Sequence, residues 1–286
     1  MTLRQHLAWA IQKLARNPAG RLEAEVLLAH ALECRRSFLF ARPELDIPNA
    51  RAQQFRDLVR RRQRGEPVAY LTGRREFWSL ELEVSPDVLI PRPETETLVA
   101  AALDHLPKPG TGLRVADIGT GSGAVALALA SERAEAEVHG TDNNPEAIEL
   151  ARRNATRLGL AQVRFHLGDW TQPLTGEFNL IASNPPYVAD DDPHLLEGDC
   201  RFEPRAALSP GHDPLDAIRE ITAQATGLLS IGGWLLFEHG FDQGPAVREI
   251  LAAAGLRSVA TLPDLEGRER VSLGVRVKGQ SKSRKA

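Results

Sequence analysis

The sequence contains few cysteines, no long apolar run and little net charge. Its 286 residues include only two cysteines, Cys34 and Cys200, which lie far apart and lack metal-ligand spacing. A disulfide framework and a cysteine-rich zinc site are therefore not expected, and the two thiols are compatible with a reducing compartment. We predict no metal site. The share of hydrophobic residues, 42%, is ordinary for a chain that buries a substantial core.

No apolar stretch approaches the ~20 residues that a membrane-spanning helix needs. The longest candidate, residues 115–130, is divided by glycines. The N-terminal residues lack the apolar core of a signal peptide, so we expect a cytoplasmic protein without a membrane partner. The formal net charge of -3 argues against a dedicated duplex-DNA binder, although it leaves room for a local basic patch.

The chain changes character near residue 75. Residues 1–75 place apolar side chains at helical spacing, which predicts a small bundle with helices at 3–14, 22–32 and 50–64. In residues 76–94, apolar side chains alternate with glutamates, and a Ser-Pro-Asp turn precedes a short apolar run at 88–90. This pattern predicts a β-hairpin linker whose returning strand is 88–90.

Residues 95–278 alternate between predicted strands and helices. The strands are predicted at 114–118, 137–141, 163–167, 180–183, 234–238, 258–262 and 271–277. Such alternation predicts an α/β, Rossmann-like domain with a seven-stranded, mostly parallel sheet that is covered on both faces. The two closely spaced final strands predict an antiparallel edge. Residues 279–286 are polar and basic, which is typical of a disordered tail.

A glycine-rich loop follows the strand predicted at 114–118. Glycine permits positive φ and close approach of the backbone to a ligand, and the next helix offers its N-terminal N–H groups. Dinucleotide sites use Gly-x-Gly-x-x-Gly, whereas Gly-x-Gly-x-Gly resembles the first motif of class I methyltransferases, which holds the amino-acid end of S-adenosylmethionine. The residues of the loop are Gly119, Thr120, Gly121, Ser122 and Gly123.

Polar residues also follow the next two predicted strands. Asp142 ends the second strand, where a carboxylate can accept both ribose hydroxyls of the cofactor. Capping of the next helix is the alternative role, although Asn143 or Asn144 could supply that cap. Asp169 and Trp170 follow the third strand and offer an acceptor and an aromatic wall for adenine. Ordinary core packing is the alternative for Trp170.

The segment Asn184-Pro185-Pro186-Tyr187 ends the fourth predicted strand. Its two prolines fix the backbone and remove two N–H donors. The Asn184 side-chain carbonyl and the Pro185 main-chain carbonyl can each accept a hydrogen bond from one substrate NH₂, and Tyr187 offers a ring face to a planar group. Positioning and preorganised acceptors promote attack by a nitrogen whose lone pair is delocalised, without a strong base. The motif fits the adenine amine and the glutamine amide equally.

The sequence resembles the bacterial HemK/PrmC family, the release factor glutamine methyltransferases, over nearly its whole length. The resemblance is carried by Gly-Glu-Pro-Val-Ala-Tyr-Leu-Thr-Gly at 65–73, Glu-Phe-Trp at 76–78, Ile-Pro-Arg-Pro-Glu-Thr-Glu at 90–96, Phe-Glu-Pro-Arg-Ala-Ala-Leu at 202–208 and Asp-Leu-Glu-Gly-Arg-Glu-Arg at 264–270. Pro214 replaces the glycine that is usual in the family's Gly-x-Asp-Gly-Leu segment, which leaves the conformation of that loop open.

The resemblance implies methyl transfer from S-adenosylmethionine to the side-chain nitrogen (N5) of the glutamine in the Gly-Gly-Gln motif of peptide chain release factors 1 and 2. It implies that residues 119–123, Asp142 and Trp170 bind the cofactor and that residues 184–187 hold the glutamine amide, with Asn184 touching both. Glutamine methylation of a ribosomal protein and adenine-N6 methylation are the alternatives, and the latter requires base flipping and a basic recognition module. A non-catalytic adaptor is a further alternative. We expect a monomer without a stable nucleic acid complex.

The family also docks its protein substrate on the N-terminal helical domain. In this chain Arg56, Arg60, Arg61, Arg62 and Arg64 form a basic helix end. It is either a solvated face or a docking site for an acidic release-factor surface.

Overall fold

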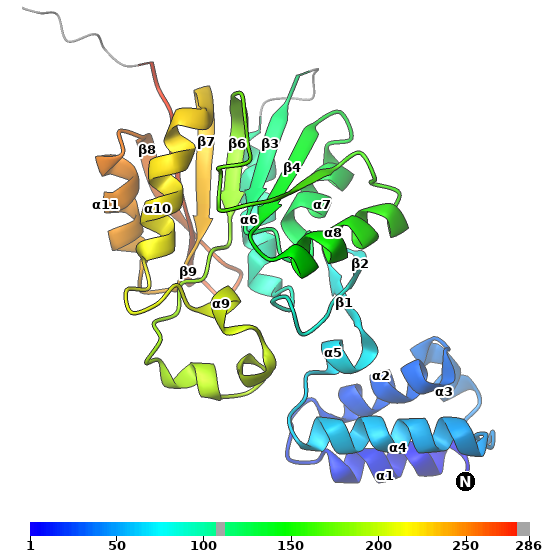
Figure 1. Cartoon of the computed structure of the whole chain (residues 1–286). Coiled ribbons are helices and arrows are strands. Elements are labelled where there is room, and N and C mark those ends of the chain that lie inside the picture. The colour runs from blue at the N-terminus through cyan, green and yellow to red at the C-terminus, as the bar shows by residue number, and fades with distance from the viewer. Residues whose placement is uncertain (107–111, 279–286) are drawn as a thin grey trace, which may run out of the picture. The chain divides into compact units, whose positions relative to one another are not determined.

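The computed structural model describes residues 1–106 and 112–278, which divide into two compact units (Figure 1). The first, called the helical unit below, consists of Met1–Arg74 and Leu196–Phe202, and the second contains the rest. The sequence did not predict that a segment near residue 200 belongs with the helical unit. The tail predicted at 279–286 lies outside the described residues. No helix in the described ranges is both long and apolar enough to cross a membrane.

The helical unit is a bundle with a core of its own. Its helices are α1 (Leu3–Lys13), α2 (Gly20–Leu32), α3 (Arg36–Ala41), α4 (Asn49–Gln63) and α5 (Val68–Thr72). Thr2 starts α1 with a capping box, in which its hydroxyl accepts from the Gln5 N–H and the Gln5 side chain accepts from the Thr2 N–H. Leu27 and Phe55 are fully buried where α2 and α4 pack. The sequence did not predict α3 and α5, which are too short for a helical period to stand out.

The hairpin forms at a different place from the one predicted. Strands β1 (Arg74–Phe77) and β2 (Leu80–Glu83) pair, and the turn is Trp78-Ser79, both with positive φ. The predicted returning strand at 88–90 is wrong, because these residues form no strand. Val88 and Ile90 are buried instead within an irregular segment, which shows that a short apolar run is no proof of pairing.

The second unit is built on a seven-stranded sheet with the order β5-β4-β3-β6-β7-β9-β8. The first five strands of this order are parallel, and β9 pairs antiparallel with both of its neighbours. The prediction of a mostly parallel sheet with an antiparallel edge is confirmed. The strands are β3 (Arg114–Ile118), β4 (Glu137–Asp142), β5 (Arg164–Leu167), β6 (Phe178–Ser183), β7 (Leu229–Glu238), β8 (Arg257–Pro263) and β9 (Glu269–Val275).

Helices cover both faces of this sheet, because successive side chains of a strand point to opposite faces. Val115 packs with α6, α7 and α8, whereas Ala116 and Ile118 pack with α10 and α11 (Figure 1). The α-helices of this unit are α6 (Glu96–His105), α7 (Ala124–Glu132), α8 (Pro145–Arg157), α9 (Arg205–Leu208), α10 (Asp216–Ala225) and α11 (Gly244–Ala253). Short 3₁₀ turns occur at Pro93–Thr95, Pro193–Leu196, Cys200–Phe202 and Thr226–Leu228.

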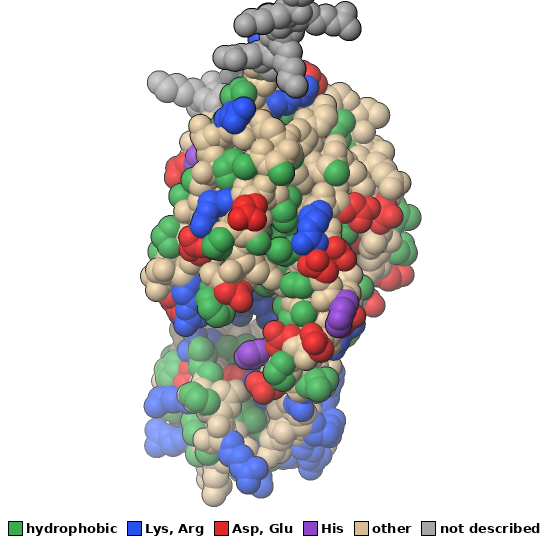
Figure 2. All heavy atoms as spheres, turned by 90° about the vertical axis from the view of Figure 1, so that its left-hand side faces the viewer, with side chains coloured by type: hydrophobic (Ala, Val, Ile, Leu, Met, Phe, Trp, Pro, Cys, Tyr) green, Lys and Arg blue, Asp and Glu red, His purple; other side chains and the backbone are tan. Residues whose placement is uncertain are grey.

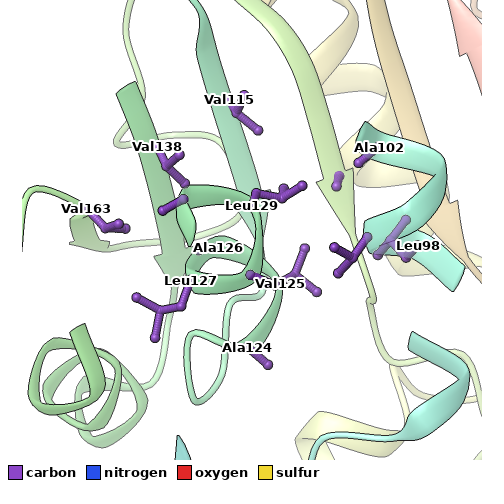
Figure 3. Packing of buried hydrophobic residues seen from close by; sticks show 14 of the residues in the cluster. Leu98, Ala102, Val115, Ala124, Val125, Ala126, Leu127, Leu129, Val138 and Val163 are labelled. Atoms are coloured by element: carbon purple, nitrogen blue, oxygen red, sulfur yellow. The ribbon is translucent and has the colours of Figure 1, made fainter. Parts of the chain in front are cut away.

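Helix α7 lies deepest among them. Every residue from Ala124 to Ala130 is buried, so this helix is apolar all round, as a helix enclosed by neighbours must be (Figure 3). Its side chains lie against Val115 and Val138 of the sheet and Leu98 of α6. Because α7 begins directly after Gly123, this packing anchors the glycine-rich loop at the carboxyl end of β3. The strand order reverses between β3 and β6, which is where α/β folds bind ligands.

Candidate functional site

A cavity of about 300 Å³ lies within the second unit at the carboxyl ends of β3, β4 and β6. Parts of the glycine-rich loop, of the segment after β6 and of residues 204–210 form its walls. Eight of the predicted site residues line it, namely Gly119, Thr120, Gly121, Ser122, Asp142, Trp170, Asn184 and Pro186. Gly123, Asp169, Pro185 and Tyr187 are not among its lining residues. The structure thus brings together side chains that the sequence places up to 67 positions apart.

The glycine-rich loop depends on glycine at three positions. Gly119, Gly121 and Gly123 have φ values of 72°, 54° and 85°, a region that favours glycine. The N–H groups of Gly119 and Thr120 both donate to the Thr141 carbonyl, at 2.9 and 2.8 Å, which ties the loop to β4. A Cβ at Gly123 would lie 3.1 Å from a leucine side chain of α7, so this glycine serves close packing rather than the cavity.

Asp117 supports the glycine-rich loop through hydrogen bonds. The sequence did not predict it as a site residue. It is buried in β3, and one of its oxygens, Oδ2, accepts from the Thr120 hydroxyl at 2.6 Å and from the Ala126 N–H at 3.1 Å. Burial raises the pKa of Asp117 to about 6, an effect that these two hydrogen bonds partly offset. A charged residue inside an otherwise apolar strand was the signal in the sequence that could have identified it.

Asp142 faces the cavity from the end of β4. Its Oδ2 accepts from the Gly121 N–H and its Oδ1 from the Asn144 N–H, both at 2.9 Å. Burial raises the pKa of this carboxyl, and the backbone hydrogen bonds lower it. The cap of α8 is Asn144, whose side chain accepts from the Glu146 N–H at 3.0 Å. The alternative role of Asp142 as that cap is therefore taken by another residue, and its carboxylate keeps free acceptor capacity toward the cavity.

The two residues after β5 differ in position. Trp170 lines the cavity, has a positive φ of 43° and packs partly against the core. Asp169 is exposed and lies 3.4 Å from the Asn143 side-chain nitrogen. The adenine-acceptor role of Asp169 stays a prediction.

The motif after β6 presents Asn184 and Pro186 to the cavity. The side-chain nitrogen of Asn184 donates to the Thr95 hydroxyl at 3.1 Å, which leaves its side-chain oxygen available as an acceptor. Tyr187 turns its hydroxyl to Glu238 Oε1, at 3.1 Å, and its main-chain carbonyl accepts from Gln243 at 2.9 Å. The proposed stacking of an amide on the Tyr187 ring therefore stays a prediction, as does the acceptor role of the buried Pro185 carbonyl.

A partly buried ion pair joins two walls of the cavity. Arg92, which lines it, pairs with Glu203, and Glu203 Oε1 also accepts from the Ile90 N–H at 3.0 Å. The following residues Pro204 and Ser209 line the cavity as well. The two family-like segments 90–96 and 202–208 thus hold each other in place, and the sequence did not predict this contact.

Pro214 fits its loop without strain. The Asp213 carbonyl accepts from the Asp216 N–H at 3.2 Å, and the Asp213 side chain accepts from the Leu215 N–H at 2.9 Å. Pro214 therefore occupies the second position of a tight turn, where proline is favoured. The departure from the family's glycine leaves the start of α10 intact.

Comparison with known proteins supplies the family. Residues 5–73 match the family described as PrmC N-terminal domain, and residues 97–197 match the one described as Methyltransferase small domain. A protein of Xylella fastidiosa (strain 9a5c) named release factor glutamine methyltransferase is 54% identical over 255 residues, which cover 89% of this chain and 92% of that protein. The chain belongs to the release factor glutamine methyltransferase family. A Pseudomonas aeruginosa protein of the same name is 51% identical over 263 residues, 92% of this chain and 95% of its own.

Solved structures support the fold. The T. thermophilus 16S rRNA N2 G1207 methyltransferase, solved with AdoMet and guanosine, superposes with a TM-score of 0.53 at 20% identity, covering 71% of this chain and 49% of its own. At this identity the likeness concerns the fold alone. Together with the family membership, it confirms the predicted class I methyltransferase fold.

Proposed function

We propose that this chain transfers a methyl group from S-adenosylmethionine to the side-chain nitrogen of the glutamine in the Gly-Gly-Gln motif of bacterial class I release factors. The observation that carries the proposal is the fixed orientation of Asn184. Its side-chain nitrogen is engaged by Thr95, so its oxygen is the group that remains to accept a hydrogen bond from a substrate NH₂ at the cavity. The Xylella fastidiosa and Pseudomonas aeruginosa relatives are both named release factor glutamine methyltransferase.

The residues around the cavity suit S-adenosylmethionine. The half-buried Asp142 carboxylate has acceptor capacity for the ribose hydroxyls, and Trp170 supplies an apolar wall for adenine. The positive-φ glycines leave the loop free of side chains where the amino-acid end would lie. When bound, the cofactor supplies an electrophilic sulfonium methyl. Asp142, Trp170 and the glycine-rich loop would hold the cofactor in the cavity that Asn184 also lines.

Asn184 and Pro185 would then position the nucleophile. The side-chain oxygen of Asn184 and the main-chain carbonyl of Pro185 each accept one hydrogen of the glutamine NH₂. Two acceptors on these hydrogens orient the nitrogen lone pair and stabilise the positive charge that develops on nitrogen during attack. No strong base is needed at this stage, since the proton leaves after the methyl group has been transferred.

The helical unit would dock the release factor. Residues 1–74 contain fourteen Arg and Lys residues but seven Asp and Glu residues, although the whole chain has a net charge of -3. Lys and Arg side chains are prominent on the helical unit in Figure 2. Within the basic helix end, Arg61 is held by Glu66 and Arg62 by Glu23, whereas Arg60 pairs with the exposed Asp57 of its own helix. Arg60 is therefore a better candidate than Arg61 or Arg62 to reach an acidic partner.

Charge reversal at Arg60 tests this docking role. Arg60→Glu should raise the KM for an intact release factor several-fold and leave the KM for a short Gly-Gly-Gln peptide unchanged, since the peptide lacks the docking surface. Asp57→Ala is the matched control, because it removes the neighbouring charge of opposite sign. An equal effect on both substrates would contradict the docking role.

We further propose that release factors 1 and 2 are both substrates and that the enzyme acts as a cytoplasmic monomer.

Methyl transfer from labelled cofactor tests the reaction itself. Peptides that contain Gly-Gly-Gln should become labelled, whereas Gly-Gly-Glu peptides should not, because the carboxylate has no NH₂ to offer. Labelling of a ribosomal protein or of an adenine-containing oligonucleotide instead would overturn the proposed substrate.

A further inference from the structure

Asn184 belongs to a group of polar residues that extends from the cavity wall, which Thr95 also lines, to Glu238. Its side-chain nitrogen lies 3.1 Å from the Thr95 hydroxyl, and the Tyr187 hydroxyl lies 3.1 Å from Glu238 Oε1. A hydrogen bond from Thr95 contributes to lowering the pKa of the Glu238 carboxyl, so the Thr95 hydroxyl lies within reach of that carboxylate. Thr95 and Glu238 are 4% and 1% exposed, so water does not compete for these groups. Glu238 Oε2 is buried and has no partner among the described residues that meets the full geometric limits of a hydrogen bond.

The direction of each hydrogen bond follows from the number of hydrogens available. A threonine hydroxyl has one hydrogen to donate. If Thr95 donates it to the Glu238 carboxylate, its oxygen must accept from Asn184, and only the NH₂ end of the Asn184 amide can donate. The side-chain oxygen of Asn184 is then the end that faces the cavity. If Thr95 instead donated to Asn184, the amide would turn over and present its NH₂ to the substrate NH₂, so that two donors would face each other.

We propose that Glu238 and Thr95 are positioning residues that set which end of the Asn184 amide faces the substrate. This proposal rests on the proposed function, because it assumes that Asn184 accepts a hydrogen bond from the glutamine NH₂. None of the sequence motifs discussed above assigned a role to either residue. Glu238 ends β7 and Thr95 ends a 3₁₀ turn, so both lie on regular elements that hold them in place.

The charge of Glu238 controls this arrangement. Burial raises the pKa of Glu238 to about 7, although hydrogen bonds from Thr95 and Tyr187 and the nearby positive charge of Arg270 lower it, and the charge of Glu94 raises it. A protonated Glu238 carries one O–H donor, and when that donor points at the Thr95 oxygen, the Thr95 hydrogen is free to turn toward Asn184. Acidification below neutral pH should therefore reduce kcat even when both substrates are saturating.

Substitution at Thr95 tests the proposal directly. Thr95→Val keeps the shape but removes the hydroxyl, and kcat for a Gly-Gly-Gln peptide should fall ~10- to 100-fold, less than for loss of a whole transition-state hydrogen bond. Thr95→Ser restores the hydroxyl and should recover most of this loss. Thr222→Val is the matched control, because Thr222 is equally buried and donates only to the Ile218 carbonyl of its own helix. Equal kcat values for Thr95→Val and Thr222→Val would overturn the proposal.

A substrate-free measurement separates this proposal from the proposed function. The ¹⁵N side-chain amide signal of Asn184, identified by its loss in Asn184→Asp, should shift as Glu238 titrates near pH 7. In Glu238→Gln, neither the position of this signal nor kcat should change with pH over this range. A pH-independent signal in the unmodified enzyme would overturn the network even if glutamine is methylated. Conversely, a titrating signal without glutamine methylation would overturn the proposed function alone.

Discussion

Removal of the Asp142 carboxylate should weaken binding of S-adenosylmethionine far more than it weakens the fold. A carboxylate has about four acceptor positions. The N–H groups of Gly121 and Asn144 use one on each oxygen of Asp142, and a backbone hydrogen bond from Asn143 also lowers the pKa of this carboxyl. The ribose assignment requires that the side of the carboxylate that faces the cavity accepts from two ribose hydroxyls. Asp142→Ala removes these acceptors from the cavity.

The size of the effect follows from those two hydrogen bonds. A hydrogen bond to a charged group contributes about 1.5–3 kcal/mol, so two contribute about 3–6 kcal/mol. Since each 1.4 kcal/mol corresponds to about a tenfold change in Kd, the lower bound corresponds to roughly 100-fold weaker binding of the cofactor. The loss of stability should be smaller, because burial raises the pKa of Asp142 and its charge is therefore costly without a ligand.

Isothermal titration calorimetry with S-adenosylmethionine measures this change. Asp264→Ala is the matched control, because Asp264 also accepts from two backbone N–H groups, those of Glu266 and Arg268 at 3.0 Å, but does not line the cavity. The control should lose stability and keep its Kd. A Kd for Asp142→Ala within threefold of the unmodified enzyme, with the fold intact by circular dichroism, would refute the ribose assignment.

Three further predictions concern catalysis and stability. Asn184→Ala should lower kcat about 100- to 1,000-fold in steady-state assays, because it deletes an acceptor used during methyl transfer. The Kd of the cofactor, measured by calorimetry, should change little. A comparable loss of cofactor binding would contradict this role. Gly123→Ala should lower the free energy of unfolding more than Gly267→Ala, since both have positive φ but only Gly123 has neighbours within 4 Å of a new Cβ; equal losses in urea unfolding would contradict it. Burial lowers the pKa values of His139 and His166, so both stay neutral in the fold, and their contribution to stability should decline as pH falls below their ordinary value of 6.5. The raised pKa values of Asp117 and Glu238 act in the opposite direction over the same range, so the quantity to measure is the difference in thermal unfolding midpoint between the unmodified enzyme and His166→Gln. A difference that does not depend on pH would contradict the prediction.

The periodicity of the second domain was strong enough to predict most of its architecture. The strands alternate with helices, and strands β6 and β7 contain continuous apolar runs, at 180–182 and 234–237, that stand out from the loops. Short elements lacked such a signal. Helices α3 and α5 span six and five residues, and the turn of the hairpin uses Trp78 and Ser79 at positive φ, which their residue types do not favour.

Eight of the residues that line the cavity were predictable from motifs, because each lies at or shortly after the carboxyl end of a strand, whereas Arg92, Thr95 and Asp117, which also line it, were not predicted. The residues that hydrogen-bond to these site residues, or to their neighbours in the motif, were not predictable from the sequence. Thr95 reaches Asn184 across 89 positions of the sequence, and Glu238 reaches Tyr187 across 51. Such contacts depend on which strands become neighbours in the sheet, and local patterns do not encode that order. The position of Tyr187, with its hydroxyl on Glu238, was missed for the same reason.

The most direct test of the proposed function is mass spectrometry of an intact, unmodified release factor after incubation with the enzyme and S-adenosylmethionine. The account predicts a gain of about 14 Da, one methyl group in place of a hydrogen, located by fragmentation on the glutamine of Gly-Gly-Gln. The same incubation with Asn184→Ala should yield little or none of this product. An unmodified glutamine, or a methyl group on any other residue, would contradict the account.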